Sequence, residues 1–423
     1  MTLRMVPAAR ALPQFNKGLT GTSMKIIPRP RYLERLISLK NTPDIKIITG
    51  IRRCGKSFLL RAYMKYLVES GEDCNCIFID FMNLNFESLR EYHALHAWIE
   101  ARHVPGKPNY VFIDEVQMCH QFELAVNSLH AKGKYDIYLT GSNAFLLSAD
   151  LATLFTGRYI AIHVFPFSFG EYCTYHDDKQ NIDLLFEAYT TEGGLSGSYP
   201  YRSEFERQNY IREVYNTIVT RDLVQKYGIS DTLTLQHVSE FLMDNISNLT
   251  SSNRVSRILT ANDAQTSHVT VRKYIACLCS AFLFHSIRRY DIRGKKYLET
   301  SEKYYLSDTG IRFSVLGSRN IDYGRVYENM VCMELLRRGY EVWVGKLYQR
   351  EIDFVARRGG RLIYIQVSDS IDNPETFARE YTPLLQIRDA SPKMILARTR
   401  HPVYTYEGIE IRDLADWLLH GDE

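Results

Sequence analysis

Residues 50–57 read GIRRCGKS, a spacing of glycines, lysine and serine that can bind phosphate groups. The glycines let the backbone wrap around phosphates, and amides at the start of a helix point toward negative charge. Lys56 would reach the β- and γ-phosphates of ATP, and Ser57 would bind Mg²⁺. Either Arg52 or Arg53 could touch phosphate while the other only decorates the loop. The predicted ATP-binding residues are Gly50, Ile51, Arg52, Arg53, Cys54, Gly55, Lys56 and Ser57.

Two carboxylates end the hydrophobic run YVFIDEVQ at residues 110–117. Asp114 is suited to hold Mg²⁺, directly or through water. Glu115 is suited to orient and deprotonate an attacking water. The alternative is a strand that ends in acids by chance, which the phosphate-binding pattern upstream disfavours.

Two later segments offer further polar candidates. In YLTGSN, residues 138–143, Asn143 would contact the water or the γ-phosphate, with Ser142 as the alternative residue. A turn that uses Asn143 only for local geometry explains this segment equally well. In LFTGRY, Arg158 could stabilise γ-phosphate charge in its own subunit or in a neighbouring one. A salt bridge between Arg158 and a nearby acid is at least an equal alternative.

Short apolar runs, rich in β-branched and aromatic residues, carry these candidates. They are IKIIT around 46–49, CIFID at 76–80, YVFID at 110–114, DIYLT at 136–140 and YIAIHVF at 159–165. Runs that are apolar on both faces suit strands of a parallel sheet covered by helices. The stretch after the phosphate loop has helical spacing, and Gly71 is well positioned to end it. This order predicts an α/β doubly wound domain over residues 24–200.

The character of the chain changes after Gly193-Gly194. Residues 204–290 read mainly as helices, and residues 267–287 resemble the second helix of a helix-turn-helix followed by a strand, with Ser267 as the cap. A β-hairpin turning at Arg293-Gly294 would form a wing. We therefore expect a helical, winged-helix domain over residues 201–318.

Basic residues gather on the expected recognition helix and wing, although acidic residues reduce their excess charge. Phosphate contacts from such a cluster could support weak, salt-sensitive DNA binding. The alternatives are a solvated basic face or a winged helix that packs against the first domain. The candidate DNA contacts are Arg272, Lys273, Arg288, Arg289, Arg293, Lys295 and Lys296.

A third α/β unit is expected over residues 319–423. The helical segment YENMVCMELLRRG begins at Tyr327 and precedes the strand-like segments YEVWVG, EIDFVAR, RLIYIQVS and KMILAR. At the other end, residues 1–23 contain no acidic residue and read as a disordered tail, with Met24 as an alternative start.

Several spaced motifs together resemble one family. GIRRCGKS, FIDEVQ, LTGSN, LFTGRY and PFSFGEY are similar to the bacterial and archaeal AAA-type ATPases that carry a C-terminal domain of unknown function. The resemblance continues through TRDL at 220–223, KYYLSDTGIR at 303–312 and GRVYENMVCMELLRRGYEV at 324–342. It implies an additional-strand P-loop NTPase core with strand order 5-1-4-3-2, then a winged-helix unit. The sequence gives no role to Arg221 or Asp222.

The last unit resembles a PD-(D/E)XK nuclease, a restriction-endonuclease-like fold. Active sites of this kind hold Mg²⁺ with carboxylates and use a lysine to position the nucleophile. The matching positions are Glu328, Asp353, Gln366 and Ser368, where an active member would have Glu and Lys at the last two. Gln366 is a poor Mg²⁺ ligand and Ser368 supplies no cation, so we expect a degenerate site, a structural or nucleic-acid-binding remnant, rather than active cleavage.

The whole chain adds limits. Its net charge of +3 over 423 residues gives no global argument for nucleic acid, and we find no apolar run long enough to span a bilayer. Cys54 lies in the phosphate loop, where a disulfide would block the site, so a reduced, cytoplasmic compartment is expected. We expect an Mg²⁺-dependent ATPase that rearranges its C-terminal domains. The alternatives are a nucleotide-gated DNA-binding protein with little turnover and an ATP-coupled nuclease. A homo-oligomer is required if Arg158 acts in a neighbouring subunit.

Overall fold

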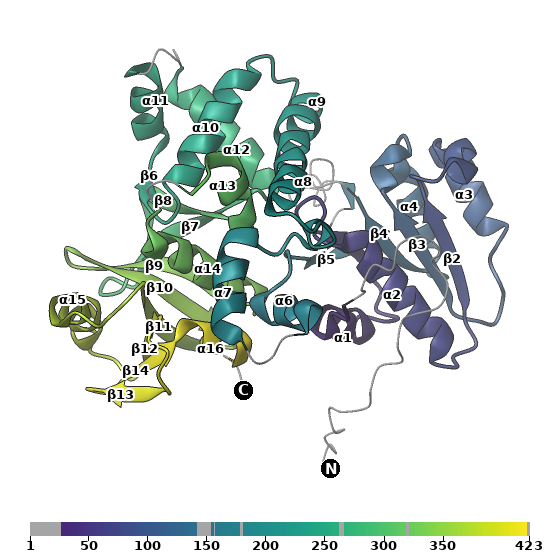
Figure 1. Ribbon diagram of the computed structural model, residues 1–423. Coiled ribbons are helices and arrows are strands. Elements are labelled where there is room, and N and C mark those ends of the chain that lie inside the picture. Colours follow the sequence, from purple (N-terminus) through teal and green to yellow (C-terminus); the bar gives the residue numbers. More distant parts are fainter. Residues whose placement is uncertain are drawn as a thin grey trace, which may run out of the picture.

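The computed structural model describes residues 27–141, 154–155, 157–177, 181–261, 266–318 and 321–420, with the backbone alone for residues 297–300. The expected tail, the alternative start at Met24 and the candidates Ser142 and Asn143 lie outside the described residues. Figure 1 shows a purple and blue N-terminal domain beside a larger, green and yellow C-terminal region.

Five parallel strands form the N-terminal sheet, in the order β2-β3-β4-β1-β5. Read from the other edge this is 5-1-4-3-2, so the predicted P-loop fold is confirmed. The strands are β1 (Ile45–Thr49), β2 (Asn75–Asp80), β3 (Asn109–Asp114), β4 (Asp136–Thr140) and β5 (Tyr159–His163).

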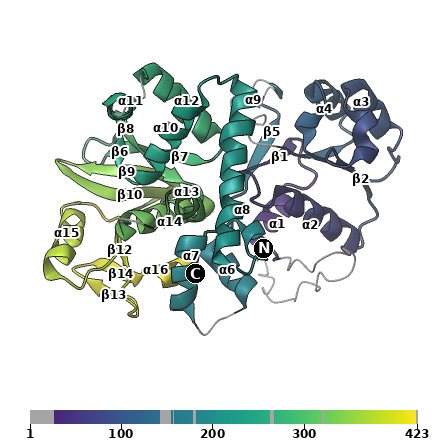
Figure 2. The same cartoon turned by 45° about the horizontal axis from the view of Figure 1, so that its top comes forward.

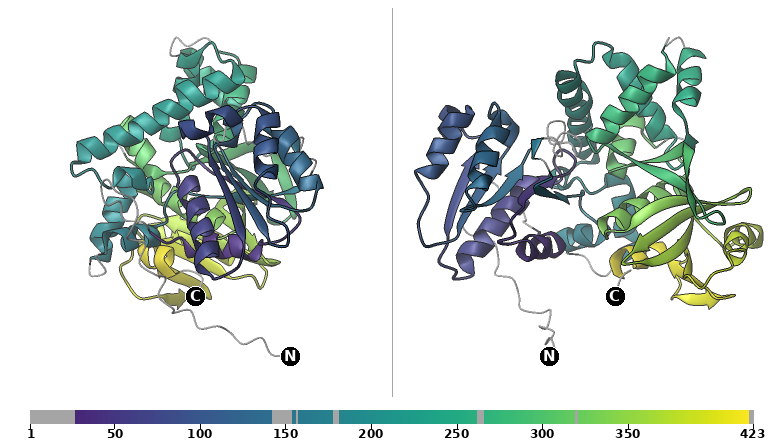
Figure 3. Two further views of the ribbon diagram at one scale, coloured as in Figure 1. Left: turned by 90° about the vertical axis from the view of Figure 1, so that its right-hand side faces the viewer. Right: turned by 180° about the vertical axis from the view of Figure 1, so that it is seen from behind.

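Helices cover both faces of this sheet because its strands are apolar on both sides (Figure 3). Along β3, Tyr110 and Phe112 belong to one core, with side chains of α1 and α2. Val111 and Ile113, which point the other way, belong to a second core, with side chains of α3 and α4. The helices are α1 (Pro30–Ser38), α2 (Lys56–Glu69), η1 (Leu84–Leu89), α3 (Tyr92–Glu100), η2 (Val116–Met118) and α4 (Phe122–Ala131).

A set of helices connects the N-terminal domain to the rest of the chain, and α8 runs between the two bodies (Figure 2). The first helix, α6, begins with a capping box in which Ser168 and Glu171 satisfy each other's backbone amides. The helices are α6 (Phe169–His176), α7 (Ile182–Glu192), η3 (Ser196–Ser198), α8 (Glu204–Asn216), a π-helix (Thr217–Leu223) and α9 (Val224–Tyr227).

The next part combines helices with a β-hairpin, as expected. Ser267 caps α12, since its hydroxyl accepts the Thr270 amide at 3.1 Å. The hairpin strands β7 and β8 are antiparallel and turn through residues 292–295. The elements are α10 (Thr232–Asp244), β6 (Leu249–Thr250), α11 (Ser252–Ala261), α12 (His268–Ser280), β7 (Phe284–Asp291), β8 (Lys296–Leu306) and α13 (Thr309–Leu316).

A nine-stranded sheet joins this hairpin to the last part of the chain, in the order β13-β14-β12-β11-β10-β9-β7-β8-β6. Because β7 pairs with β9, the boundary expected near residue 318 does not separate two independent sheets. The remaining elements are α14 (Tyr323–Arg337), β9 (Glu341–Leu347), β10 (Arg350–Arg358), β11 (Arg361–Ser368), α15 (Pro374–Leu385), β12 (Lys393–Ala397), β13 (Tyr404–Tyr406), β14 (Ile409–Asp413) and α16 (Leu414–His420).

Two chain-wide properties complete the fold. In the part of the chain that the structure describes, no helix combines the length and hydrophobicity needed to cross a bilayer. The eight cysteines are free thiols.

Candidate phosphate-binding site

The phosphate loop, residues 50–57, connects the end of β1 to the start of α2. Gly50 has a φ of 141°, and a Cβ there would lie 2.0 Å from the carbonyl oxygen of Val164. Only glycine fits such a close approach between two backbones. Gly55 has a φ of 99° and directly precedes the first turn of α2. The two glycines therefore fix the loop at the amino end of the helix, where backbone amides favour anions.

Lys56 is buried, and its ammonium lies against its own loop. The Nζ atom donates to the carbonyl oxygens of Gly50 at 2.9 Å and Ile51 at 3.2 Å. Both partners are neutral, so the positive charge stays available to an anion such as phosphate.

Asp114 ends β3 beside the loop and is bonded to two hydroxyl groups. Its Oδ1 accepts the Ser57 hydroxyl at 3.0 Å and the Thr140 hydroxyl. Burial raises the pKa of the Asp114 carboxyl. The hydrogen bonds from the two hydroxyls stabilise the ionised form and act against this shift. Thr140 is a residue that the sequence reading missed. Its position could have indicated it, because Thr140 ends β4, and the ends of the parallel strands β3 and β4 lie at the same edge of the sheet.

Glu115 follows Asp114 in a left-handed backbone conformation, with a φ of 54°. Its carboxylate accepts the side-chain amide of Gln117, and its backbone N–H lies 3.4 Å from the Thr140 hydroxyl oxygen. An unfavourable backbone region at a non-glycine residue needs support from its surroundings and is common at functional sites. The structure thus brings together Lys56, Ser57, Asp114 and Glu115, with Thr140 between the last two.

Arg158 is not part of this group within one chain. It directly precedes β5, and its carbonyl oxygen accepts the Ile45 amide at the start of β1, at 3.0 Å. The phosphate loop follows the other end of β1, roughly 13 Å along the strand at 3.3 Å per residue. A contact between Arg158 and phosphate in its own subunit is therefore not supported, and a contact in a neighbouring subunit stays a prediction.

Comparison with known proteins identifies the family of the domain that contains these residues. The AAA domain family matches residues 42–173, and two domains of unknown function match residues 183–322 (DUF8612) and 323–416 (DUF4143). An uncharacterized protein of Haemophilus influenzae is 37% identical over 402 residues, which are 94% of this chain and 100% of that protein. The chain belongs to this AAA-type family. The uncharacterized protein MJ1544 of Methanocaldococcus jannaschii is 26% identical over 354 residues, covering 79% of this chain and 77% of that protein.

Two solved structures also match parts of the chain. DnaA from Aquifex aeolicus, bound to AMPPCP, has a TM-score of 0.31 and 14% identity, over 60% of this chain and 89% of that chain. Cdc6p from Pyrobaculum aerophilum has a TM-score of 0.29 and 11% identity, over 74% of this chain and 97% of that chain. Both TM-scores lie below 0.5, so these similarities say nothing about the function of this chain.

Arg29 binds the backbone of the phosphate loop in the AAA domain, and the sequence did not reveal this role. Its guanidinium donates to both carboxylate oxygens of Glu171 at 2.8 and 2.9 Å and to the Cys54 carbonyl at 3.0 Å. It also donates to the Phe165 carbonyl at 2.9 Å. Arg29 stands between two prolines before α1, a position that no motif marks. These bonds from one planar group fix the loop to α6 and to the segment after β5.

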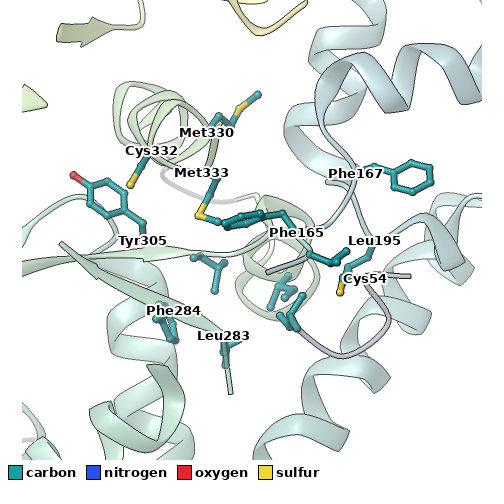
Figure 4. Packing of buried hydrophobic residues seen from close by; sticks show 14 of the residues in the cluster. Cys54, Phe165, Phe167, Leu195, Leu283, Phe284, Tyr305, Met330, Cys332 and Met333 are labelled. Atoms are coloured by element: carbon teal, nitrogen blue, oxygen red, sulfur yellow. The ribbon is translucent and has the colours of Figure 1, made fainter. Parts of the chain in front are cut away.

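Cys54 turns its side chain away from the expected ligand. The thiol lies in the hydrophobic core, and Figure 4 shows it near Leu195 and facing the cluster that contains Phe165 and Met333. Burial raises the pKa of the thiol, so it stays protonated and behaves as a small apolar group. Cys54 therefore contributes its backbone to the phosphate loop and its side chain to packing.

Arg52 connects the phosphate loop to the C-terminal region. Its Nη1 lies 3.1 Å from Oδ2 and 3.4 Å from Oδ1 of Asp222, in the π-helix after α8. Burial raises the pKa of Asp222, while the charges of Arg52, Arg221 and Lys56 oppose that shift. Asp222 thus acquires a partner that the sequence did not reveal, because the π-helix returns to the loop from 170 residues away. Neighbouring Arg221 is exposed, and Arg53 adopts a left-handed conformation with a φ of 66°.

A second contact between the two bodies is aromatic. The ring of His163, at the end of β5, lies 4.3 Å from the rings of both Phe165 and Phe282 and 5.7 Å from that of His285. Burial lowers the pKa of His163 well below its usual value, with help from the charges of His285 and Lys56. Burial also lowers the pKa of His285 to about 4. Two neutral imidazoles therefore pack where the AAA domain meets the C-terminal hairpin.

The expected nuclease positions lie on α14 and on two strands of the C-terminal sheet, and three of the four come together. The backbone amide of Asp353 donates to Gln366 Oε1 at 2.7 Å. Glu328 of α14 is joined to them by Lys303, whose Nζ lies 2.9 Å from Glu328 Oε1 and 4.0 Å from Asp353 Oδ1. Ser368 is bonded elsewhere, since its hydroxyl donates to the Ser370 carbonyl at 2.9 Å. The sequence reading missed Lys303 on β8 and Glu380 on α15, because both come from elements outside the strand pattern that it used.

The candidate DNA contacts are exposed, except Arg289, which is half-exposed. Arg272 and Lys273 are exposed on α12, and Lys295 and Lys296 are exposed at the hairpin turn. Two further exposed residues have a neighbouring side chain: Arg288 lies 3.7 Å from Glu302, and Arg293 lies 5.1 Å from the ring centre of Tyr348.

Proposed function

We propose that this AAA-type protein hydrolyses ATP with Mg²⁺ and passes the change at the phosphate loop to its C-terminal region. Lys56 would bind the β- and γ-phosphates, and the amides at the start of α2 would add to that attraction. Glu115 would orient and deprotonate the attacking water. Thr140 would keep Asp114 and Glu115 in register, because its hydroxyl bonds to both residues.

The donor set at this site fits Mg²⁺. The Ser57 hydroxyl and the Asp114 carboxylate supply oxygens within 3.0 Å of each other, and Mg²⁺ prefers such ligands. When bound, Mg²⁺ would neutralise charge that develops on the phosphate oxygens. Ser57 and Asp114 are the residues that would hold it.

The ion pair between Arg52 and Asp222 is the observation that supports coupling. Phosphate and the Asp222 carboxylate are both anions, so both compete for the same guanidinium. A γ-phosphate that draws Arg52 away would leave Asp222 half-buried without a partner, at a cost. The π-helix that carries Asp222 is a rare conformation, often found at functional positions, and could relax into a regular helix. The nucleotide state would thereby change the position of α8 and α9.

ATP turnover measured in three forms of the protein tests the hydrolysis. Wild type is expected to hydrolyse ATP in Mg²⁺, Lys56→Ala to lose nucleotide binding and turnover together, and Glu115→Gln to bind ATP without turning it over. Turnover that survives both substitutions would exclude this site as the place of reaction.

A second function, DNA binding, is favoured by the hairpin part of the chain. The order α10, β6, α11, α12, β7, β8, with β8 antiparallel to both β6 and β7, supports a winged helix in which α12 would be the recognition helix. Arg272, Lys273, Lys295 and Lys296 would contact phosphates there.

DNA retention at increasing salt tests this second function. Arg272→Gln combined with Lys273→Gln is expected to weaken binding about tenfold at moderate salt and to reduce its salt dependence. Arg35→Gln combined with Lys134→Gln removes the same charge from exposed positions of the AAA domain and is expected to change nothing. Equal effects of the two pairs would contradict a DNA site on α12.

Arg158 would act only in an assembly. From its place at the amino end of β5 it could reach a phosphate loop of a neighbouring subunit. Mixing an Arg158→Ala chain with a Lys56→Ala chain tests this, because only a site shared between subunits would recover turnover.

A further inference from the structure

We propose that the Lys303 ammonium takes the place of a divalent metal in the carboxylate centre of the C-terminal sheet, so that this centre functions without metal. The centre consists of Lys303 and Gln366 with four acidic residues, Glu328, Glu351, Asp353 and Glu380. The inference is independent of the proposed ATP hydrolysis.

Lys303 occupies the middle of the acidic group. It is only 2% exposed, on β8, and its Nζ lies 2.9 Å from Glu328 Oε1 and 2.7 Å from Glu351 Oε1. A third carboxylate, that of Asp353, lies 4.0 Å away. One ammonium thus meets oxygens from three carboxylates, the same ligand type that a nuclease offers to Mg²⁺.

Several carboxylate oxygens of the centre also accept hydrogen bonds from donors other than Lys303. Asp353 Oδ2 accepts the Val367 amide at 2.8 Å, and Glu328 Oε1 also accepts the Tyr305 hydroxyl at 2.7 Å. Gln366 donates its side-chain amide to Glu380 at 2.9 Å, and Arg379 donates to the same carboxylate. Across the described ranges, no group of three or more His, Cys, Asp or Glu side chains has the arrangement to hold a metal ion.

Lack of space does not explain this arrangement. A cleft of about 580 Å³ opens beside the centre, and its lining includes Glu351, Asp353, Gln366 and Glu380. Water and small ions can therefore reach the acids from one side. A metal would instead have to displace a covalently attached cation that is already in contact with the same oxygens.

The charge of Lys303 is stable in this environment. Burial alone would lower the pKa of its ammonium, but the charges of Glu328, Asp353 and Glu351 raise it above its usual value. Burial raises the pKa of both Glu328 and Asp353, with Lys303 acting in the opposite direction.

Lys303 also connects separate parts of the fold. It comes from the β7–β8 hairpin, whereas Glu328 lies on α14 and Glu351 and Asp353 lie on β10. An internal ammonium at this position links the hairpin to the last unit permanently. A metal would link them only when bound.

Mn²⁺ binding, measured by electron paramagnetic resonance without nucleotide, tests the proposal. Wild type is expected to bind no Mn²⁺ at this centre, so Asp353→Asn should leave the Mn²⁺ binding of the chain unchanged. Lys303→Met frees the carboxylates and is expected to create such a site, so that millimolar Mn²⁺ raises its melting temperature by several degrees. Asp353→Asn added to Lys303→Met should abolish that gain. Lys134→Met, at an exposed lysine of the AAA domain outside the proposed binding sites, serves as the control and should behave as wild type.

Three results would overturn the proposal. They are a wild-type Mn²⁺ site that Asp353→Asn removes, metal-dependent plasmid cleavage that Asp353→Asn abolishes, and a folded Lys303→Met chain that gains no Mn²⁺ site. Should Lys303→Met fail to fold, the wild-type and Asp353→Asn titrations still decide the matter. ATP turnover by wild type does not enter any of these outcomes.

Discussion

Two buried lysines, each near acidic strand residues, have opposite partners in this protein. Lys56 of the phosphate loop is 8% exposed and donates to two neutral carbonyl oxygens. Lys303 of the C-terminal sheet is 2% exposed and is bonded to carboxylates. The charge of Lys56 stays available to an incoming anion, whereas the charge of Lys303 is neutralised by carboxylates inside the protein.

The surroundings extend this difference. The acid nearest the phosphate loop, Asp114, is bonded to hydroxyl groups, and amides at the start of α2 add positive potential. In the carboxylate centre four acids share one lysine and one arginine, Arg379. Phosphate would therefore be attracted to the first site and repelled by the second. The type of partner, rather than the presence of a lysine among acids, separates a ligand site from a structural one.

Replacing each lysine by methionine tests the comparison with the largest expected effects. Lys56→Met should lower ATP turnover roughly 10²-fold or more, because it removes a charge that stabilises the transferring phosphate. Its melting temperature should stay close to that of wild type, since the lost bonds go to loop carbonyls. Lys303→Met should instead cost about 3–5 kcal/mol of unfolding free energy, because buried carboxylates lose their cation.

Turnover assays and thermal melting on both variants measure this contrast. Turnover per folded molecule should survive in Lys303→Met, and Lys134→Met, at an exposed lysine of the AAA domain, should resemble wild type in both measurements. If both methionine variants lost activity and stability to the same degree, the distinction between the two lysines would be wrong.

Thr140→Val tests how the phosphate site keeps its acids in position. The substitution preserves shape but removes the hydroxyl that bonds to Asp114 and to the Glu115 amide. We expect turnover to fall about tenfold, as is typical when a positioning hydrogen bond is lost, with little change in ATP affinity. Thr140→Ser keeps the hydroxyl and should recover most of the activity. A valine variant with full turnover would show that Asp114 is held by Ser57 alone.

Much of the first region could be predicted from the sequence because its chemistry is local. The pattern GIRRCGKS and the run ending in Asp114 and Glu115 each lie on one strand end, and parallel strands bring such ends to one edge. Thr140 escaped because a single threonine at a strand end is not distinctive. Arg29 and Asp222 escaped because their contacts span 142 and 170 residues, and no periodicity encodes such a distance.

The second region was harder to predict for the same reason. A motif search expects the nuclease lysine on β11, where Ser368 stands, and so finds no cation. The structure supplies one from β8, across a parallel pairing of β7 with β9 that joins two units expected to be separate. Residues that match a motif could be named, but the residue that neutralises them depends on tertiary contacts.

Asp222→Asn examines how far the first site depends on the C-terminal region. The substitution weakens the ion pair with Arg52 and leaves that guanidinium free for phosphate. We expect ATP affinity to increase a few-fold, since a pair at this partly exposed position contributes on the order of 1 kcal/mol. Proteolysis around α9 should also become less sensitive to ATP. Glu213→Gln, which removes one exposed charge from α8, should leave ATP affinity unchanged, and an identical response of both variants would contradict the coupling.

The smallest expected effect concerns acidity at the contact between the two regions. Burial lowers the pKa of His285 to about 4 and that of His163 well below its usual value. Below about pH 6.5 both histidines bind protons in the unfolded chain, but they remain neutral in the folded chain until the pH is lower. The free energy of unfolding should therefore fall as the pH drops from about 6.5 toward 4, and these two histidines should contribute nothing above that range.

Comparison of wild type with His285→Gln isolates this contribution. Glutamine can keep the hydrogen bond to Ser307, which lies 3.0 Å from His285 Nε2. Urea unfolding at pH 5.5 and 7.5 should show wild type losing about 1 kcal/mol more than the variant between the two conditions. Asp308, whose pKa burial raises to about 7, acts in the opposite direction, but it is present in both chains and cancels from the difference. If the free energy of unfolding fell equally in the two chains, His285 would be protonated at pH 5.5 in the folded protein. The contact between the two regions would then be accessible to water rather than dry.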